Sequence, residues 1–171
     1  MPSSSAQQPL SAPVPITADH DVAQFDCGKP PLTDWLRQHA RKNDGKASRT
    51  FVVCEGQRVV AFYALAAGSM RIDDVSKKLA RNMPPIIPVL VLGRMAVDKN
   101  DQGRKIGSYL LKDALKRALN ISREVGARAV LVHAIDQDVV PFHADYGFKP
   151  FPEGELTLFL PIQDIAATLT P

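Results

Sequence analysis

The segment VLVLGRMAV at residues 89–97 decides the fold, because it is apolar almost throughout and leads directly into a polar turn. An apolar run of this kind is typical of a strand that is covered on both faces of a sheet. The turn DKNDQGRK at residues 98–105 is followed by an apolar stripe at helical spacing from about Ile106 to Val125. Gly126 follows and is expected to end the helix.

This strand, turn and helix predict a site for an anion. The first amides of a helix have no intrahelical partner, and the helix dipole adds partial positive charge there. Arg104 and Lys105 flank the turn and could add charge-assisted bonds to phosphate oxygens. An ordinary strand–helix connection with solvated basic residues is the alternative, and the glycine spacing alone does not separate the two.

The remaining patterns predict an alternation of strands and helices, which is typical of an α/β layer arrangement with a mixed sheet. Periodicity and turn signals predict an amphipathic helix at 32–41, hairpin strands at 50–54 and 58–65, a strand at 129–135, a short helix at 139–146 and a closing strand at 155–160. Residues 71–88 are expected to form a short helix and then a loop, because the prolines near the end of this segment disfavour a regular central element.

Length and composition predict one domain. With 171 residues and 45% apolar content, the chain can build one α/β core, which we place at residues 14–171 after a flexible Ser/Pro-rich leader at 1–13. The net charge of +3 is well below that of a dedicated nucleic-acid binder.

The cysteine spacing and the N-terminus bear on the compartment. Cys27 and Cys54 show neither metal-ligand nor redox spacing, so we expect free thiols, a reducing compartment and no metal. The N-terminus lacks the features of a signal peptide, and no stretch has the ~18 apolar residues of a membrane span. These features predict a cytoplasmic protein without a membrane partner.

Two segments carry a family resemblance. Residues 92–107, together with FHADYGF at 142–148, resemble the acyl-CoA motif and the later FYxxxGF helix of the GNAT acetyltransferase superfamily. The resemblance implies a GNAT fold: a mixed, mostly antiparallel central sheet flanked by helices. Strands 89–97 and 129–135 would splay apart to form the acyl-CoA cleft.

Further segments narrow the resemblance to one branch. Residues 25–28, 47–54, 62–69, 81–84 and 157–160 look like those of GNAT toxins from type II toxin–antitoxin modules, the TacT- and AtaT-like proteins. Such a toxin transfers acetyl from acetyl-CoA to the α-amine of aminoacyl-tRNA and blocks translation. The resemblance also implies a ribbon–helix–helix antitoxin as partner and a homodimer. The alternatives are an N-acetyltransferase of a small amine or protein terminus, and a weakened GNAT-fold module that mainly binds its antitoxin.

The same resemblance assigns the donor site. Main-chain groups of Met95, Ala96 and Val97 would bind the pantetheine arm. The pyrophosphate would be held by the turn and helix start, which comprise Gln102, Gly103, Arg104, Lys105, Ile106, Gly107 and Ser108. An amine would attack the thioester carbonyl, a backbone N–H would stabilise the oxyanion, and a general acid would protonate the departing thiolate.

Two residues depart from the family pattern at sensitive positions. Lys105 stands where the phosphate turn has its first motif glycine, which is used where backbone approaches phosphate or needs unusual dihedrals. The lysine would crowd the pyrophosphate or supply a compensating contact. His143 stands where the family has its general-acid tyrosine; an imidazolium with a pKa near 6.5 can protonate a thiolate. Tyr146, about one turn further on, is the second candidate for this role.

Arg94, Tyr63 and His133 have both structural and functional interpretations. Arg94 is the one charge of its strand, and the resemblance favours the acceptor cleft over a structural ion pair. Tyr63 is a core residue or an acceptor contact, while His133 is a hydrogen-bonded core histidine or faces the donor. A group of basic residues forms either a solvated face or a rim for tRNA phosphates: Arg37, Arg41, Lys42, Lys46 and Arg49.

Overall fold

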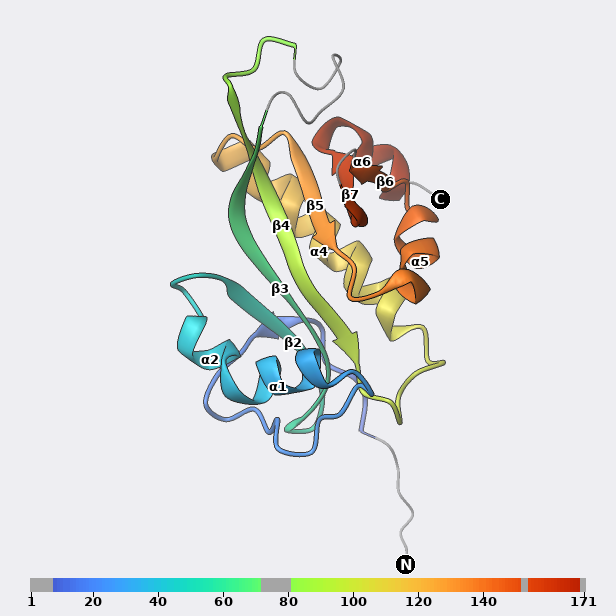
Figure 1. Cartoon of the computed structure of the whole chain (residues 1–171). Coiled ribbons are helices and arrows are strands. Elements are labelled where there is room, and N and C mark those ends of the chain that lie inside the picture. Colours follow the sequence, from blue (N-terminus) through green and yellow to red (C-terminus); the bar gives the residue numbers. More distant parts are fainter. Residues whose placement is uncertain (1–7, 72–80, 152–153, 170–171) are drawn as a thin grey trace, which may run out of the picture. The chain divides into compact units, whose positions relative to one another are not determined.

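A computed structural model of the chain describes residues 8–71, 81–151 and 154–169 (Figure 1). The chain divides into two compact units, residues 1–64 with 95–111 and residues 65–94 with 112–171. The described helices and strands are β1 (Val14–Pro15), α1 (Pro30–Gln38), α2 (Ala40–Asn43), β2 (Arg49–Glu55), β3 (Arg58–Arg71), β4 (Ile86–Val97), α4 (Ile106–Glu124), β5 (Ala129–His133), η2 (Gln137–Val139), α5 (Val140–Ala144), β6 (Lys149–Phe151), β7 (Gly154–Pro161) and α6 (Ile162–Leu169).

The described strands form one mixed sheet in the order β1-β2-β3-β4-β5-β7-β6. Strand β1 is antiparallel to β2, β5 to β7, and β6 to β7, whereas β4 is parallel to β5. The parallel register runs from Val89↔Ala129 to Leu92↔Val132, although β4 itself continues to Val97. The predicted mixed, mostly antiparallel sheet is confirmed.

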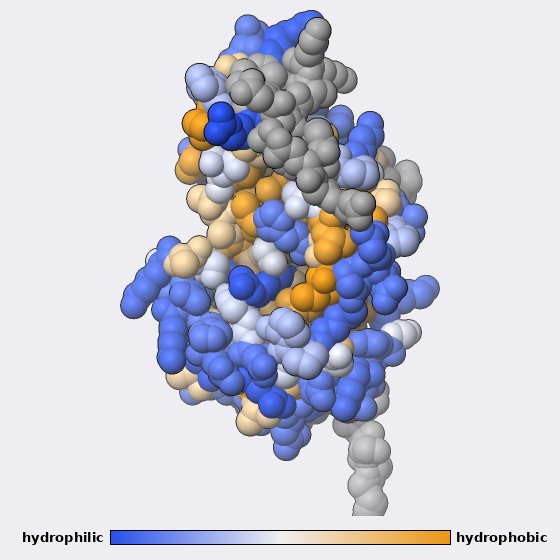
Figure 2. Space-filling model, viewed as in Figure 1, coloured by the Kyte–Doolittle hydropathy of each residue, from blue (hydrophilic) through white to orange (hydrophobic). Residues whose placement is uncertain are grey.

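In the first unit, α1 buries one face against an aromatic core. The helix begins with two prolines, which the first helical turn tolerates because its amides need no intrahelical partner. Trp35 stacks on Phe62 at 5.9 Å between ring centroids, and Phe25 meets Phe62 edge-on at 5.6 Å. The surface in view around α1 and α2 is mostly hydrophilic, as an amphipathic helix requires (Figure 2).

In the second unit, the apolar core lies over the parallel strand pair. Ile87 and Val89 of β4 cluster with Ala129 and Leu131 of β5 and with Met70 of β3. Helix α6, which the sequence patterns did not predict, buries Ile165 and packs beside β5 and β7. Its Thr168 hydroxyl donates to the Tyr146 carbonyl at 3.1 Å and so ties the C-terminal helix to the segment after α5.

Several predicted boundaries are wrong. The helix predicted at 32–41 breaks at His39 into α1 and α2. Strand β3 continues to Arg71, and β4 begins at Ile86 and includes Pro88, where a loop was predicted. Pro88 has no N–H to donate, but its carbonyl accepts from the Arg128 amide at 2.9 Å. The middle of the predicted helix and loop at 71–88, residues 72–80, lies outside the described residues.

The N-terminal segment pairs earlier than predicted. Leu10 bridges to Glu55, and the Ser11 amide donates to the Cys54 carbonyl at 2.8 Å. Leu10 and Ser11, which lie within the leader predicted over residues 1–13, therefore add to the edge of β2 ahead of β1. Cys54 and Cys27 are both buried and free, which confirms the prediction of free thiols.

None of the helices in the described ranges has the length and apolar character that a membrane span needs.

Gly68 in β3 allows a close approach between neighbouring strands. A Cβ built at this position would lie 2.6 Å from Cγ2 of Val91, well inside van der Waals contact. We expect Gly68→Ala to lower the free energy of unfolding by about 1 kcal/mol, because overpacking costs about 1–3 kcal/mol and alanine recovers about 0.4–1 kcal/mol through the unfolded state. Urea denaturation measures the change.

Gly126→Ala is the matched control, because a Cβ added at Gly126 would have nothing within 4 Å and no strain opposes it. Adding Val91→Ala to the Gly68→Ala variant should restore part of the loss. Equal stability of the two glycine variants would contradict the steric argument.

Candidate active site

The turn between β4 and α4 has an unusual backbone. Gly103 and Lys105 both have positive φ, +92° and +63°. The Lys105 carbonyl accepts the Tyr109 amide at 3.2 Å, so the helical bonding of α4 begins here. The amides at the start of this 19-residue helix therefore present partial positive charge, as an anion site requires.

The start of the turn is fixed by Asp98, whose buried side chain serves two segments. One carboxylate oxygen accepts the Asn100 amide at 2.9 Å, and the other accepts the Asp26 amide at 3.1 Å. The Asp98 amide donates to the Val60 carbonyl at 2.8 Å. The turn is thus held to the loop before α1 and to β3 within the first unit.

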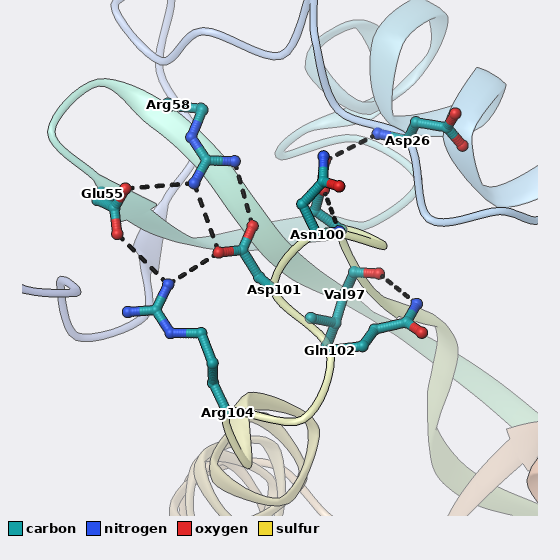
Figure 3. A network of polar contacts seen from close by, with 9 residues as sticks. Asp26, Glu55, Arg58, Val97, Asn100, Asp101, Gln102 and Arg104 are labelled. Carbon is teal, nitrogen blue, oxygen red and sulfur yellow. Dashed lines mark hydrogen bonds and ion pairs between the residues drawn. The ribbon is translucent and has the colours of Figure 1, made fainter. Parts of the chain in front are cut away.

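The middle of the turn is held by four charged side chains. The buried carboxylate of Asp101 accepts from Arg104 at 2.8 Å and from Arg58 at 3.1 Å. Glu55 accepts from the same two arginines, each at 3.3 Å (Figure 3). The hydrogen bond to Asp101 is the main cause that raises the pKa of Arg58, which favours the charged guanidinium.

In the second unit, α5 carries a buried histidine. His143 is 7% exposed and lies edge-on to Phe142 and Phe148 at 5.2 and 5.7 Å. Its Nδ1 has no hydrogen-bond partner among the described residues. Burial lowers the pKa of His143, so the neutral imidazole is favoured at neutral pH. Tyr146 is half-buried and packs on Phe142 at 5.5 Å.

Residues 16–148 match the model of the acetyltransferase (GNAT) family. The chain belongs to the GNAT acetyltransferases. It is 42% identical over 160 residues to a tRNA-acetylating toxin of Mycobacterium tuberculosis (strain ATCC 25618 / H37Rv), covering 93% of this chain and 96% of that protein. These findings confirm the resemblance on which the fold prediction depended.

Two solved structures of the toxin AtaT are similar to the whole chain. AtaT complexed with acetyl-methionyl-tRNA matches with a TM-score of 0.85 and 29% identity, over 95% of this chain and 100% of that one. A mutant AtaT bound to the C-terminus of the antitoxin AtaR and acetyl-CoA matches with a TM-score of 0.80 and 28% identity, over 95% and 99%. The GNAT fold is therefore shared along nearly the full length.

The structure brings the predicted donor residues together but gives two of their side chains other partners. The Arg104 guanidinium binds Asp101 and Glu55, whereas we expected it to be available to phosphate. The Gln102 amide group donates to the Val97 carbonyl at 3.2 Å, so one of the main-chain groups expected to meet pantetheine already has a partner. The backbone amides of the turn remain the better candidates for an anion.

The network that holds the turn was not predicted. Arg104 lies three residues after Asp101, and Arg58 lies three residues after Glu55, a spacing at which opposite charges often pair. The signal was therefore present, but only the fold brings the two pairs together. The described residues contain no group of three or more His, Cys, Asp or Glu that could hold a metal.

Four other candidate side chains have surroundings that bear on their interpretation. Tyr63 is fully buried and stacks on Phe51 at 5.1 Å, which favours its interpretation as a core residue. Arg94 is exposed, and partial burial lowers its pKa. His133 is also exposed, with its Nδ1 3.2 Å from the Thr157 hydroxyl. The imidazolium expected at His143 is disfavoured by burial.

Lys105 occupies the position where the GNAT motif has glycine, and its φ of +63° explains that preference. Left-handed backbone costs a non-glycine residue about 1–2 kcal/mol, and glycine loses about 0.5–1 kcal/mol more entropy on folding. Lys105→Gly should therefore raise the free energy of unfolding by about 0.5–1 kcal/mol. Lys105→Ala keeps the Cβ and should give no such gain in urea denaturation; an equal gain from both variants would attribute the effect to the lysine side chain.

Burial of His143 also predicts a pH dependence of stability. Because its folded-state pKa is lowered from 6.5, the unfolded chain binds the proton more readily, and stability should fall as the pH drops below about 6.5. His143→Gln should remove this component, up to about 1.4 kcal/mol per pH unit. Chemical denaturation between pH 7.5 and 5 measures it, with exposed His133→Gln as control. An unchanged slope in His143→Gln would contradict the assignment.

Proposed function

We propose that this chain is a toxin that transfers an acetyl group from acetyl-CoA to the α-amine of aminoacyl-tRNA and so blocks translation. The 42% identity to a tRNA-acetylating toxin, over 93% of this chain and 96% of that protein, carries the proposal. The similarity to AtaT complexed with acetyl-methionyl-tRNA supports the same acceptor.

The donor would be bound mainly by backbone. Amides of residues 102–108 would hold the pyrophosphate of acetyl-CoA, because the backbone N–H groups at the start of a helix and the helix dipole favour an anion. Main-chain groups of residues 95–97 would meet the pantetheine arm. Lys105 has the left-handed backbone that the motif glycine would adopt, so the turn keeps its conformation despite the substitution.

The amine of the aminoacyl group would attack the thioester carbonyl, and its nitrogen would lose a proton to solvent as the amide forms. The C–S bond would break, and the thiolate of CoA would leave with a proton from a general acid. Two side chains near the end of α5 compete for this role. His143 is buried and mainly neutral, and a neutral imidazole is a poor acid. Tyr146 is half-buried and carries a phenolic O–H, a group that can act as a donor. We therefore favour Tyr146 as the proton donor.

The assembly and compartment are inferred from the toxin-like relatives. AtaT bound to the C-terminus of AtaR supports an antitoxin partner for this chain, and we propose one with a ribbon–helix–helix domain. We further propose a homodimer of single acetyltransferase domains that acts in the cytoplasm, where charged tRNA is found.

A second candidate function has one observation in its favour. The described surroundings of His143 give it no polar partner, and burial disfavours its charged form, so proton donation at this position is weak. A catalytically weakened module that mainly binds its antitoxin would fit this finding. An N-acetyltransferase of small amines or protein termini would instead retain turnover with those acceptors.

Acetylation of charged tRNA tests the proposal. We expect the purified chain to acetylate the aminoacyl α-amine in the presence of acetyl-CoA. Mass spectrometry of the amino acid released from the tRNA detects the acetyl group. Tyr146→Phe should lower kcat by about 10²-fold or more if this residue is the general acid, whereas His143→Phe should change it little. No transfer to any charged tRNA, with retained binding of acetyl-CoA, would sink the tRNA assignment.

A variant that restores the family residue separates the alternatives. His143→Tyr should raise kcat if the histidine limits proton donation. The KM for acetyl-CoA should stay nearly unchanged, because residue 143 lies outside the turn at residues 98–105. Absence of binding and of turnover in every variant would favour the antitoxin-binding module.

A further inference from the structure

The β2–β3 hairpin is joined to the turn at residues 98–105, between β4 and α4, which we call the phosphate turn. The contact is made by four charged side chains of Figure 3, which we call the charged clamp: Glu55, Arg58, Asp101 and Arg104. Glu55 is the last residue of β2 and Arg58 the first of β3. The tight turn between them contains Gly56 at a φ of +64°. The clamp therefore connects a rigid end of the sheet with a loop that has no regular structure.

Burial makes this contact different from the surface ion pairs of the chain. The Asp101 side chain is only 5% exposed and accepts from both arginines, so removal of either leaves a buried carboxylate short of donors. Arg49 and Asp44, by contrast, meet at 3.4 Å with the arginine side chain 62% exposed. Exposed pairs of that kind contribute little.

The turn contains a strained residue, so its conformation must be stabilised by contacts with other parts of the chain. Lys105 has a φ of +63°, which costs a non-glycine residue about 1–2 kcal/mol, and such conformations persist only when the surroundings impose them. Asp101 lies four residues before Lys105, and its side chain forms the ion pair with Arg58 of the hairpin. Arg104, immediately before Lys105, forms ion pairs with the carboxylates of Asp101 and Glu55.

We propose that Arg58 is a positioning residue for the acyl donor: through Asp101 it holds the phosphate turn in the conformation that presents its amides to the pyrophosphate of acetyl-CoA. Arg104 belongs to the same clamp and is not a phosphate ligand. The inference rests on the donor binding of the proposed function, but not on the identity of the acceptor.

The test compares a donor that carries the pyrophosphate, which the turn is proposed to bind, with a donor that lacks it. Acetyl-CoA carries the pyrophosphate, whereas S-acetylpantetheine lacks both the pyrophosphate and the 3′-phosphoadenosine beyond it, and keeps the thioester and the pantetheine arm. We would measure the Kd of acetyl-CoA by calorimetry and that of S-acetylpantetheine by saturation-transfer NMR, without any acceptor. Failure to acetylate charged tRNA would therefore leave this measurement intact.

The variants are chosen to keep side-chain volume. Arg58→Met and Asp101→Asn remove the charge from either side of the clamp, and Arg58→Lys keeps the charge with a shorter reach. Arg49→Met on neighbouring β2 is the matched control, because it removes an arginine from an exposed ion pair. A thermal unfolding curve for each variant, with a midpoint above the temperature of the binding measurements, establishes that the variant is folded.

We expect Arg58→Met and Asp101→Asn each to weaken acetyl-CoA binding about tenfold, which is the effect of losing roughly one hydrogen bond to a charged phosphate. The Kd of S-acetylpantetheine should stay within about twofold of the unmodified chain. Arg58→Lys should recover part of the loss, and Arg49→Met should lose nothing. Equal weakening of the binding of both donors would overturn the proposal, and so would unchanged acetyl-CoA binding in the clamp variants. Failure of the unmodified chain to bind acetyl-CoA would overturn it as well.

Discussion

The buried carboxylate of Asp101 is the constraint on which the candidate donor site depends. A carboxylate this far from water requires compensating charge, and Arg58 and Arg104 supply it at 3.1 and 2.8 Å. Since Arg58 belongs to β3 and Asp101 to the turn before α4, satisfying the carboxylate also fixes where the turn lies on the first unit. Asp98 completes this arrangement by bonding the same turn to the loop that precedes α1.

The two departures from the GNAT motif differ in their physical consequences. Lys105 replaces a glycine at a backbone position of positive φ, so its cost is conformational and falls on the stability of the turn. His143 replaces a tyrosine inside an aromatic cluster, so its cost is electrostatic: burial disfavours the imidazolium, and Nδ1 is unsatisfied within the described residues. Under the proposed function, the first departure would bear on how the donor is held, whereas the second would bear on which side chain near α5 gives a proton to the leaving thiolate.

The long apolar and periodic segments were predictable, and the weak ones were not. The apolar run of β4, the stripe of α4 and the hairpin of β2 and β3 were all found because burial of whole faces imposes a period on the sequence. The two-residue β1, the three-residue β6 and the extension of β4 through Pro88 carry no such period. They form because a neighbouring strand offers backbone partners, which a local pattern does not reveal.

The sequence by itself determined the GNAT fold, the position of the polar turn before α4 and the two residues that depart from the family motif, because these depend on local spacing and on family resemblance. Tertiary structure decided the roles of individual side chains. It placed Tyr63 in the core, turned Arg104 toward Asp101 and Glu55, and enclosed His143 among Phe142 and Phe148. Charge pairing and desolvation depend on residues that are distant in the chain, and only the folded backbone brings those residues within a few ångströms of one another.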